Sequence, residues 1–233
     1  MTGVYPPVTY VSFQDLKARV MSAADALSRR DVNQYICLKH VVQREFESIE
    51  QNRDNIGSAI RFTYFPDIET LIVKVPSKQQ EKAHATIGGR LIRKVARMGV
   101  GDLEFQALGA TQPGGWPLLV VEAGVSESMP RLRCDASWWI SNSNGEVQMV
   151  LIIEVSRNPK KVPQTQVQPG PVCQAHKVWA TMIDQQANPP MVLGAPLRLE
   201  FYKVIGRPAI PLMEHDIVFT SADLLEWSRY VFI

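Results

Sequence analysis

Cysteine is scarce in this sequence: only Cys37, Cys134 and Cys173 occur, and no two of them form a CxxC pair. We therefore expect free thiols in a reducing compartment and no disulfide framework. The N-terminal stretch MTGVYPPVTYVSF has neither the basic nor the apolar segment of a secretory signal. No apolar run approaches the length of about 18 residues that a membrane span needs. These absences predict a cytoplasmic or nuclear protein with no membrane partner.

A strong charge of either sign is also missing, because 25 Lys and Arg residues nearly balance 23 Asp and Glu residues. The formal net charge of +2 demands no nucleic acid partner, although it allows a local basic face. The chain has no P-loop, no dinucleotide GxGxxG, no HExxH and no GxSxG, so the enzyme classes that use these motifs are not supported. Cys173 and His176 have CxxH spacing, but a structural zinc ion needs four ligands and no second pair is present.

Apolar residues make up 45% of the chain, which is enough for a substantial core. Helical spacing in FQDLKARVMSAADALSRR predicts a first helix, and part of YICLKHVVQREFESIEQ predicts a second. We interpret residues 1–55 as an N-terminal helical arm, too short and too charged to hold a core of its own. Residues 56–233 are then expected to form the main α/β domain, in one globular unit with the arm.

The segments AIRFTYF and TLIVKV, separated by Pro66 and Asp67, predict a β-hairpin. Residues 78–98 then predict a helix with one apolar stripe. The remaining surface of this helix carries a row of basic residues, Arg90, Arg93, Lys94 and Arg97. Such a row is typical of a solvated helix face, and it is also compatible with a face that follows nucleic acid phosphates.

The stretch WPLLVVEAGV predicts a central strand, because it is apolar on both faces, and Glu122 stands near its end. Pro130 fits the first turn of a following helix, and NGEVQMVLIIEVSR predicts a second apolar strand. Strand, helix and strand together indicate a parallel βαβ unit. We therefore expect an α/β (α+β) fold with a central mixed sheet flanked by helices.

The last third of the chain predicts less regular structure. The stretch of residues 157–171 is rich in Pro, Gln and Lys, and we interpret it as a long loop. VCQAHKVWATMI and LRLEFYKVI are expected to be late strands. Thr220 and Asp223 resemble a capping box, which predicts a short C-terminal helix.

Glu122 is the candidate catalytic residue, because α/β folds place their active and ligand-binding sites at the ends of strands. Metal-assisted cleavage of a phosphodiester needs two or three acidic oxygens around Mg²⁺ or Mn²⁺ and a cation that stabilises charge. The other candidate carboxylates are Asp102, Glu104, Asp135 and Glu154. The alternative is structural: Glu122 caps a turn or pairs with Arg131 or Arg133.

The segments WPLLVVEAGVSES, RLRCDASWW and NGEVQMVLII resemble those of a large group of uncharacterised fungal proteins with a restriction-endonuclease-like fold of the PD-(D/E)XK type. The resemblance extends from about residue 13 onward, through the helix ending in ARMG and the closing HDIVFTSADLLEW. It implies a mixed sheet flanked by helices and an ancestral metal site at a strand end. Within that site it implies Glu122 as a metal ligand and Asp102 as its nearest acidic companion.

The chain departs from the PD-(D/E)XK pattern at two points. No Pro-Asp precedes the Glu122 strand, because GATQPGG runs directly into WPLL, and Asp102 is the nearest substitute. The lysine of the motif is replaced by Gly124, and the following turn offers Arg131, Arg133 and Asp135. Arginine stabilises charge but stays protonated, so it does not act as a general base. Only the glutamate of the motif carries over.

Three hypotheses follow. The chain is a degenerate nuclease-like protein that binds nucleic acid through Arg90, Arg93, Lys94 and Arg97. Alternatively, it is an active Mg²⁺- or Mn²⁺-dependent nuclease that uses Glu122 with Asp102, Asp135 and Arg131. In the third hypothesis it is a protein-interaction scaffold, with Trp138 either an anchor for a partner or a residue of a second core layer.

Overall fold

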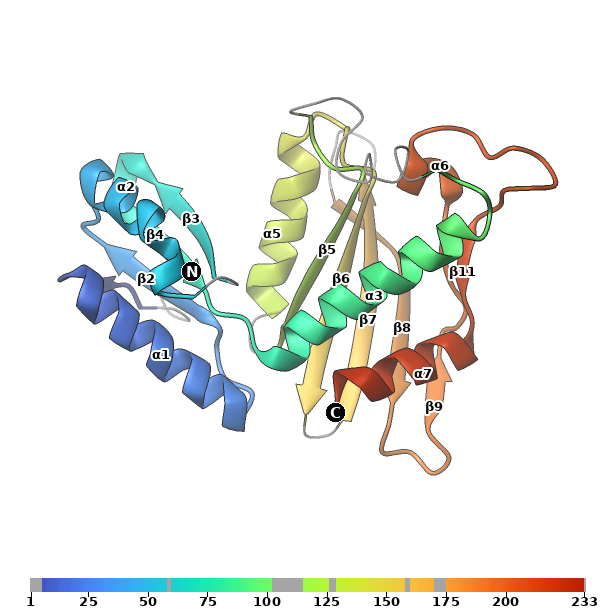
Figure 1. Cartoon of the computed structure of the whole chain (residues 1–233), viewed down its shortest axis with the longest axis horizontal. Coiled ribbons are helices and arrows are strands. Elements are labelled where there is room, and N and C mark those ends of the chain that lie inside the picture. The colour runs from blue at the N-terminus through green and yellow to red at the C-terminus, as the bar shows by residue number, and fades with distance from the viewer. Residues whose placement is uncertain are drawn as a thin grey trace. The chain divides into compact units, whose positions relative to one another are not determined.

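The computed structural model describes residues 6–57, 60–101, 115–125, 129–157, 160–169 and 175–232. The chain divides into two compact units, Met1–Lys78 and Gln79–Ile233. Each unit combines helices with β-sheet structure, and parallel and antiparallel strand pairs occur in both (Figure 1). The protein is therefore a mixed α/β protein whose sheets are flanked by helices, as the sequence predicts.

The first unit is built on a four-stranded sheet of order β1-β2-β4-β3. β1 is parallel to β2, and the other neighbouring strands are antiparallel, including the predicted hairpin of β3 and β4. The elements of this unit are β1 (Val8–Thr9), α1 (Phe13–Arg29), β2 (Tyr35–Lys39), α2 (Gln43–Gln51), β3 (Arg61–Phe65) and β4 (Thr70–Lys74), with short 3₁₀ turns at Arg53–Asn55 and Pro66–Ile68.

The structure differs from the helical arm predicted over residues 1–55. Tyr35–Lys39 forms a strand, and this strand pairs along its whole length with β4, which lies beyond the predicted boundary. The pairing gives both segments one core, whose fully buried members include Leu16, Leu38 and Leu71. The first unit therefore holds a core of its own and ends at Lys78. A boundary at residue 55 would separate β2 from β4, and these two strands are paired.

The second unit contains a five-stranded sheet of order β5-β6-β7-β8-β9 and a two-stranded sheet of β10 and β11. β5 and β6 are parallel, and they are joined through α5 as the predicted βαβ unit. The elements of this unit are α3 (Lys78–Ala96), β5 (Leu119–Val125), α5 (Met129–Asn142), β6 (Met149–Arg157), β7 (Lys160–Pro169), β8 (Ala175–Asp184), β9 (Met191–Leu193), β10 (Leu197–Leu199), α6 (Phe201–Ile205), β11 (Ile217–Phe219) and α7 (Ser221–Val231).

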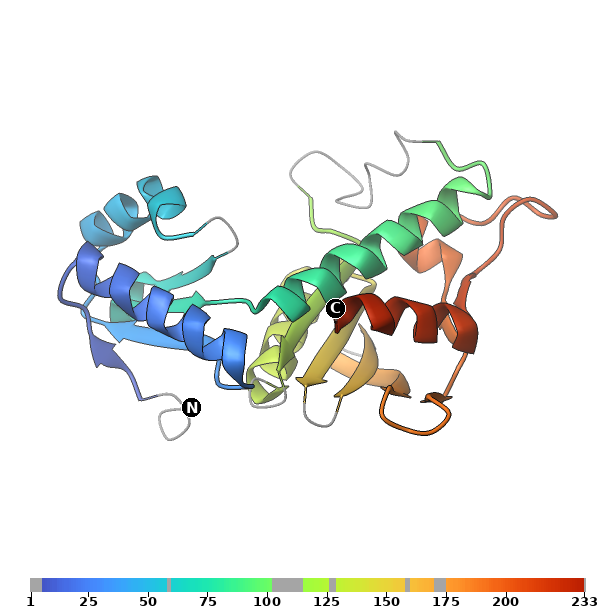
Figure 2. The ribbon, with the colours of Figure 1, turned by 60° about the horizontal axis from the view of Figure 1, so that its bottom comes forward.

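Helices cover both faces of the five-stranded sheet (Figures 1 and 2). Val150 and Ile152 of β6 join a buried cluster with α5, whereas Leu151 and Ile153 join a larger cluster with α3 and α7. Alternate residues of a strand point to opposite faces, so α5 lies on one face and the α3–α7 pair on the other. This alternation explains why β5 and β6 are apolar on both faces, as their sequences predict.

The prediction of a long loop over residues 157–171 is wrong, because β7 occupies Lys160–Pro169 and pairs with both β6 and β8. The sequence did not predict this strand, because the many Pro, Gln and Lys residues of the segment are typical of a loop. Gln164 is buried and accepts a hydrogen bond of 2.9 Å from the Thr181 hydroxyl of β8, so a polar side chain is accommodated inside. Pro163 stands where the β6–β7 pairing is interrupted, so its missing N–H costs no bond to β6.

Candidate nucleic-acid interface

Glu122 lies on β5 and faces α5. Val120, two residues earlier on the same face, belongs to the buried cluster that α5 forms with the sheet. The Glu122 side chain is itself buried, with 5% of the residue exposed. The indole N–H of Trp139 donates a hydrogen bond of 3.2 Å to Glu122 Oε1. Burying a carboxylate without such donors destabilises the fold. The hydrogen bond from Trp139 therefore lowers the cost of burying Glu122 beneath α5.

Arg131 and Asp135, the other predicted site residues of this region, form an ion pair along α5. Arg131 Nε lies 2.8 Å from Asp135 Oδ1, at the i, i+4 spacing of neighbours on a helix surface. Both side chains are largely buried, with 12% and 20% of their surfaces exposed. Asp135 therefore neutralises Arg131, and this pairing competes with the metal-ligand role predicted for it.

A complete metal site is not present in the part of the chain that the structure describes. Asp102 and Glu104 lie outside the described residues. Glu154 is level with Gly124 in the parallel register and points to the same face as Glu122, roughly 8 Å away between Cα atoms by strand geometry. Within the described ranges, no group of three or more His, Cys, Asp or Glu residues is placed to hold a metal ion. These residues by themselves do not fit Mg²⁺ or Mn²⁺.

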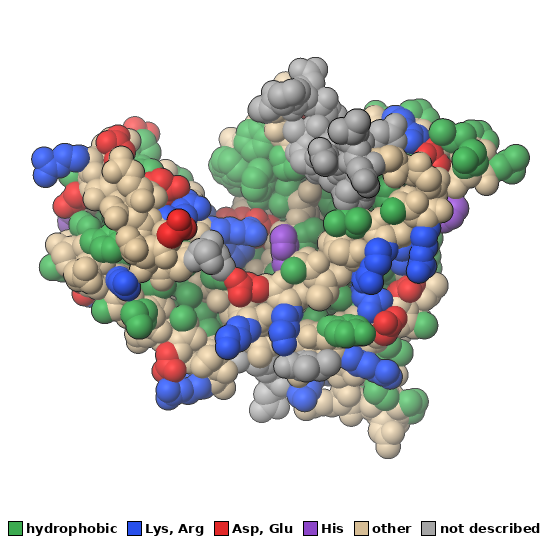
Figure 3. Space-filling model, in the orientation of Figure 1, with side chains coloured by type: hydrophobic (Ala, Val, Ile, Leu, Met, Phe, Trp, Pro, Cys, Tyr) green, Lys and Arg blue, Asp and Glu red, His purple; other side chains and the backbone are tan. Residues whose placement is uncertain are grey.

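The predicted basic residues gather in an open groove between α3 and α7. The groove has a volume of about 570 Å³, and Arg90, Arg93, Lys94 and Arg97 of α3 line it. The facing helix contributes Asp223, Glu226 and the half-exposed ring of Tyr230. Four cations against two carboxylates leave a net charge of +2 in the groove. Figure 3 shows Lys and Arg atoms gathered over α3 with acidic atoms beside them.

Two of the four cations are bound by α7. Arg90 Nη2 lies 3.1 Å from Glu226 Oε1, and Lys94 Nζ lies 3.0 Å from Asp223 Oδ2. The guanidinium of Arg90 also lies over the Tyr230 ring, 5.6 Å from its centroid. Among the described residues, neither Arg93 nor Arg97 forms an ion pair with a carboxylate of the groove. Arg93 Nε donates a hydrogen bond to the Gly89 carbonyl of its own helix at 3.3 Å, and the charge of Arg93 acts on Glu226 without direct contact.

The acids of α7 are held in their charged forms. The hydrogen bond from Arg90 lowers the pKa of Glu226 below its ordinary value. For Asp223, burial is the largest single influence and raises the pKa, but hydrogen bonds from Thr220 and Lys94 together lower it below the ordinary value. Both carboxylates are therefore ionised at neutral pH, and they compete with any anion that enters the groove.

The sequence predicted the cations of this groove but not its opposite wall. Thr220 and Asp223 do form the predicted capping box of α7. Asp223 serves at the same time as the partner of Lys94, which lies 129 residues away. The spacing of Asp223, Glu226 and Tyr230 places them on one face of a helix, and this was the available signal for the missed residues.

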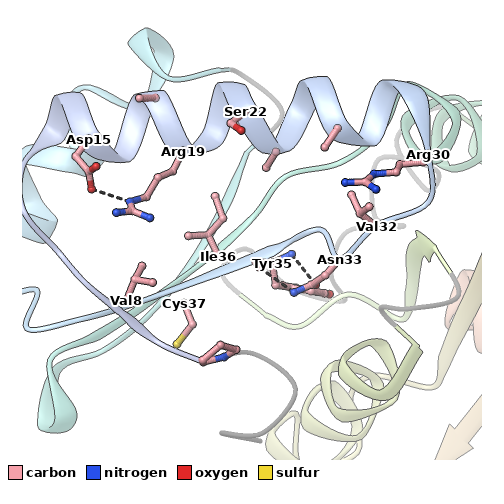
Figure 4. A pocket seen from close by; sticks show the side chains of 14 residues that line it. Val8, Asp15, Arg19, Ser22, Arg30, Val32, Asn33, Tyr35, Ile36 and Cys37 are labelled. Carbon is pink, nitrogen blue, oxygen red and sulfur yellow. Dashed lines mark hydrogen bonds and ion pairs between the residues drawn. The ribbon is translucent and has the colours of Figure 1, made fainter.

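A second groove, of about 700 Å³, lies in the first unit between α1 and β2 (Figure 4). Small side chains of α1 leave the space for it, namely Ala18, Ser22 and Ala26. The side chain of Asn33 accepts the Tyr35 N–H at 3.0 Å and donates to the Tyr35 carbonyl at 3.1 Å. It thereby occupies backbone groups of β2 that a bound peptide strand would need.

Comparisons with models of protein families, with curated proteins and with solved structures found no match to this chain. Among the described residues, no helix combines the length and the apolar character that crossing a membrane requires.

Proposed function

We propose that this chain is a nucleic-acid-binding protein on a degenerate nuclease-like core, and that it holds the sugar–phosphate backbone in the groove between α3 and α7. The observation that carries the proposal is the groove itself, whose four cations exceed its two carboxylates. Contacts of Lys and Arg with phosphates bind nucleic acid without reading its sequence. Tyr230 supplies an aromatic surface on which a base could stack.

The nuclease-like part of the proposal is supported by the β5–α5–β6 unit and by Glu122 on its first strand. This arrangement agrees with the resemblance to proteins of the PD-(D/E)XK type. Impaired cleavage is supported by the ion pair of Asp135 with Arg131 and by the glycine that replaces the lysine of the motif. A single carboxylate rarely binds Mg²⁺ productively.

The first test is fluorescence anisotropy with labelled single- and double-stranded DNA and RNA, at about 50 and about 200 mM salt. We expect the double variant Arg93→Ala/Arg97→Ala to weaken binding for all sequences. Each lost phosphate contact should lower the magnitude of the log–log salt slope by about 0.7 to 0.9, so the double variant should lose about 1.4 to 1.8. Both side chains lie on one exposed helix face, so the fold should tolerate the change.

The matched control is Lys39→Ala/Arg44→Ala, which removes the same charge from exposed positions of the first unit. Equal weakening in both double variants would show that overall charge and not the groove binds nucleic acid. Absence of binding by the wild-type protein at the lower salt would refute the proposal. Cleavage is tested in the same samples with Mg²⁺, Mn²⁺ or a chelator. If the protein cuts only with metal and Glu122→Gln abolishes the cutting, the protein is an active nuclease, and the proposal of impaired cleavage is wrong.

A further inference from the structure

The groove between α3 and α7 has an aromatic end. The two helices lie side by side and run in opposite directions (Figures 1 and 2). Arg90 pairs with Glu226, whereas Lys94, one turn later on α3, pairs with Asp223, which comes earlier on α7. Tyr230, one turn beyond Glu226 on α7, therefore lies toward the start of α3. The cations that follow Arg90 on α3 lead away from this aromatic end.

The aromatic end has room for a flat ligand. The guanidinium of Arg90 lies over the Tyr230 ring, but 48% of this tyrosine remains exposed. The wall that α3 contributes there has only small residues, namely Ala85, Thr86 and Gly89. A Cβ built on Gly89 would meet no atom within 4 Å apart from its own helix backbone and its chain neighbours. An aromatic ligand can therefore approach α3 closely and stack on the open part of the Tyr230 ring.

Arg93 and Arg97 form an exposed basic row on α3, along the rest of the groove. They are four residues apart, so their positions differ by about 6 Å along the helix axis. Asp223 and Glu226 face them from α7, and both carboxylates are charged. Phosphates are attracted to the basic row and repelled by the acidic wall. The groove therefore complements the backbone of one strand, since the lining residues that the structure describes offer no second basic row for the other backbone of a duplex.

We infer that the groove binds single-stranded nucleic acid: an unpaired base stacks on Tyr230, and phosphates of the same strand bind Arg93 and Arg97. This inference rests on the proposed function and names the form of nucleic acid that the groove takes. In a duplex the neighbouring base pairs cover the faces of each base, so an aromatic side chain finds a free face in a single strand, a loop or an end. Neither contact involves the 2′-hydroxyl group, so DNA and RNA should bind alike.

The test is fluorescence anisotropy with three labelled ligands, prepared as DNA and as RNA. These are a single strand of about 12 nucleotides, its duplex, and an abasic strand of the same length that keeps the phosphates but has no bases. We expect the wild-type protein to bind the single strand several-fold more tightly than the duplex or the abasic strand. Tyr230→Leu should weaken binding of the single strand about tenfold, because it removes one stacked base, and should leave the other two Kd values unchanged.

Two further readouts separate stacking from a structural role of Tyr230. Tyr230→Phe keeps the ring and should bind like the wild type. The salt slope of Tyr230→Leu should equal that of the wild type, because the phosphate contacts remain. Tyr202→Leu is the matched control, since Tyr202 is a 56% exposed tyrosine of α6 that does not line the groove, and it should bind like the wild type. Circular dichroism establishes that each variant is folded.

The inference and the proposed function fail in different ways. Wild-type protein that binds the duplex or the abasic strand as tightly as the single strand overturns the inference and leaves the proposed function intact. The same holds if Tyr230→Leu binds the single strand like the wild type, or if Tyr230→Phe is as weak as Tyr230→Leu. Absence of binding to all three ligands would instead refute the proposed function, and the inference with it.

Discussion

At the scale of single residues, the two buried carboxylates in the described part of the chain, Glu122 and Glu214, each accept hydrogen bonds from a specific side chain. Glu122 accepts a hydrogen bond from the indole N–H of Trp139, whereas Glu214 accepts hydrogen bonds from Nη1 and Nη2 of Arg207. The two sites differ in chemistry, because the indole donor is neutral and the arginine is charged. A charged bidentate partner stabilises the ionised carboxylate more strongly than a neutral donor does.

The Arg207–Glu214 pair gives a prediction for acid stability. The hydrogen bond from Arg207 lowers the pKa of Glu214 from 4.5 to about 2, against the opposing effect of burial. A carboxyl whose folded-state pKa is lowered stabilises the fold above its unfolded value and loses that contribution as pH falls through the folded value. We therefore expect Glu214→Gln to have a lower melting temperature than the wild type above about pH 5. This difference should shrink as the pH falls from 4.5 toward 2.

Melting curves from circular dichroism between these pH values provide the measurement. Glu50→Gln is a suitable control, because Glu50 also pairs with an arginine but is much more exposed. A difference between Glu214→Gln and the wild type that stays constant with pH would contradict the prediction.

At the scale of secondary structure elements, α3 and α7 form a pair with two roles. Their apolar faces share one buried cluster, in which Ile87, Leu91 and Trp227 meet. Their polar faces form the groove, where the acids of α7 neutralise part of the basic face of α3. Ion pairs of this kind, which stay partly open to water, contribute little to stability, about 0 to 1 kcal/mol each. Their larger effect is on the charge that a ligand of the groove encounters.

Removal of one acid of α7 should therefore strengthen the binding of nucleic acid. Glu226→Gln releases Arg90 and raises the net charge of the groove by one, so we expect a several-fold lower Kd in the anisotropy assay. Glu50→Gln, which releases Arg53 in the first unit, removes the same charge elsewhere and should leave the Kd nearly unchanged. Weaker binding by Glu226→Gln would mean that Glu226 orients Arg90 for the ligand and does not compete with it.

At the scale of the whole molecule, the two units have separate cores. The buried residues of the first unit cluster among themselves, and those of the second unit form two other clusters, one on each face of the five-stranded sheet. All five tryptophans of the chain, from Trp116 to Trp227, lie in the second unit. Tryptophan fluorescence therefore reports on the second unit alone, whereas far-UV circular dichroism reports on both.

This difference makes the independence of the cores measurable. Leu38→Ala empties a fully buried position of the first unit, and such a substitution costs about 2 to 5 kcal/mol of stability. In denaturant we expect circular dichroism to show an earlier transition for the variant, while the fluorescence transition stays where it is in the wild type. A fluorescence transition that moves together with the dichroism would show that the two units unfold as one.

Local signals were sufficient for much of this fold. The hairpin of β3 and β4, the helix α3, the parallel β5–α5–β6 unit and the capping box of α7 were all predicted from spacing, turn residues and apolar runs. The cations of the groove were also predicted, because they follow one another on a single helix. Periodicity is a property of neighbouring residues, so the sequence alone determines it.

What only the tertiary structure decided depends on residues far apart in the chain. β7 is a strand because β6 and β8 satisfy its backbone on both sides, although its own composition is typical of a loop. The first unit extends to Lys78 because β2 pairs with β4. The acidic wall of the groove arises in the same way, because Asp223 and Glu226 of α7 meet Lys94 and Arg90 of α3. Pairing and packing bring distant residues together, and no periodicity within one segment contains that information.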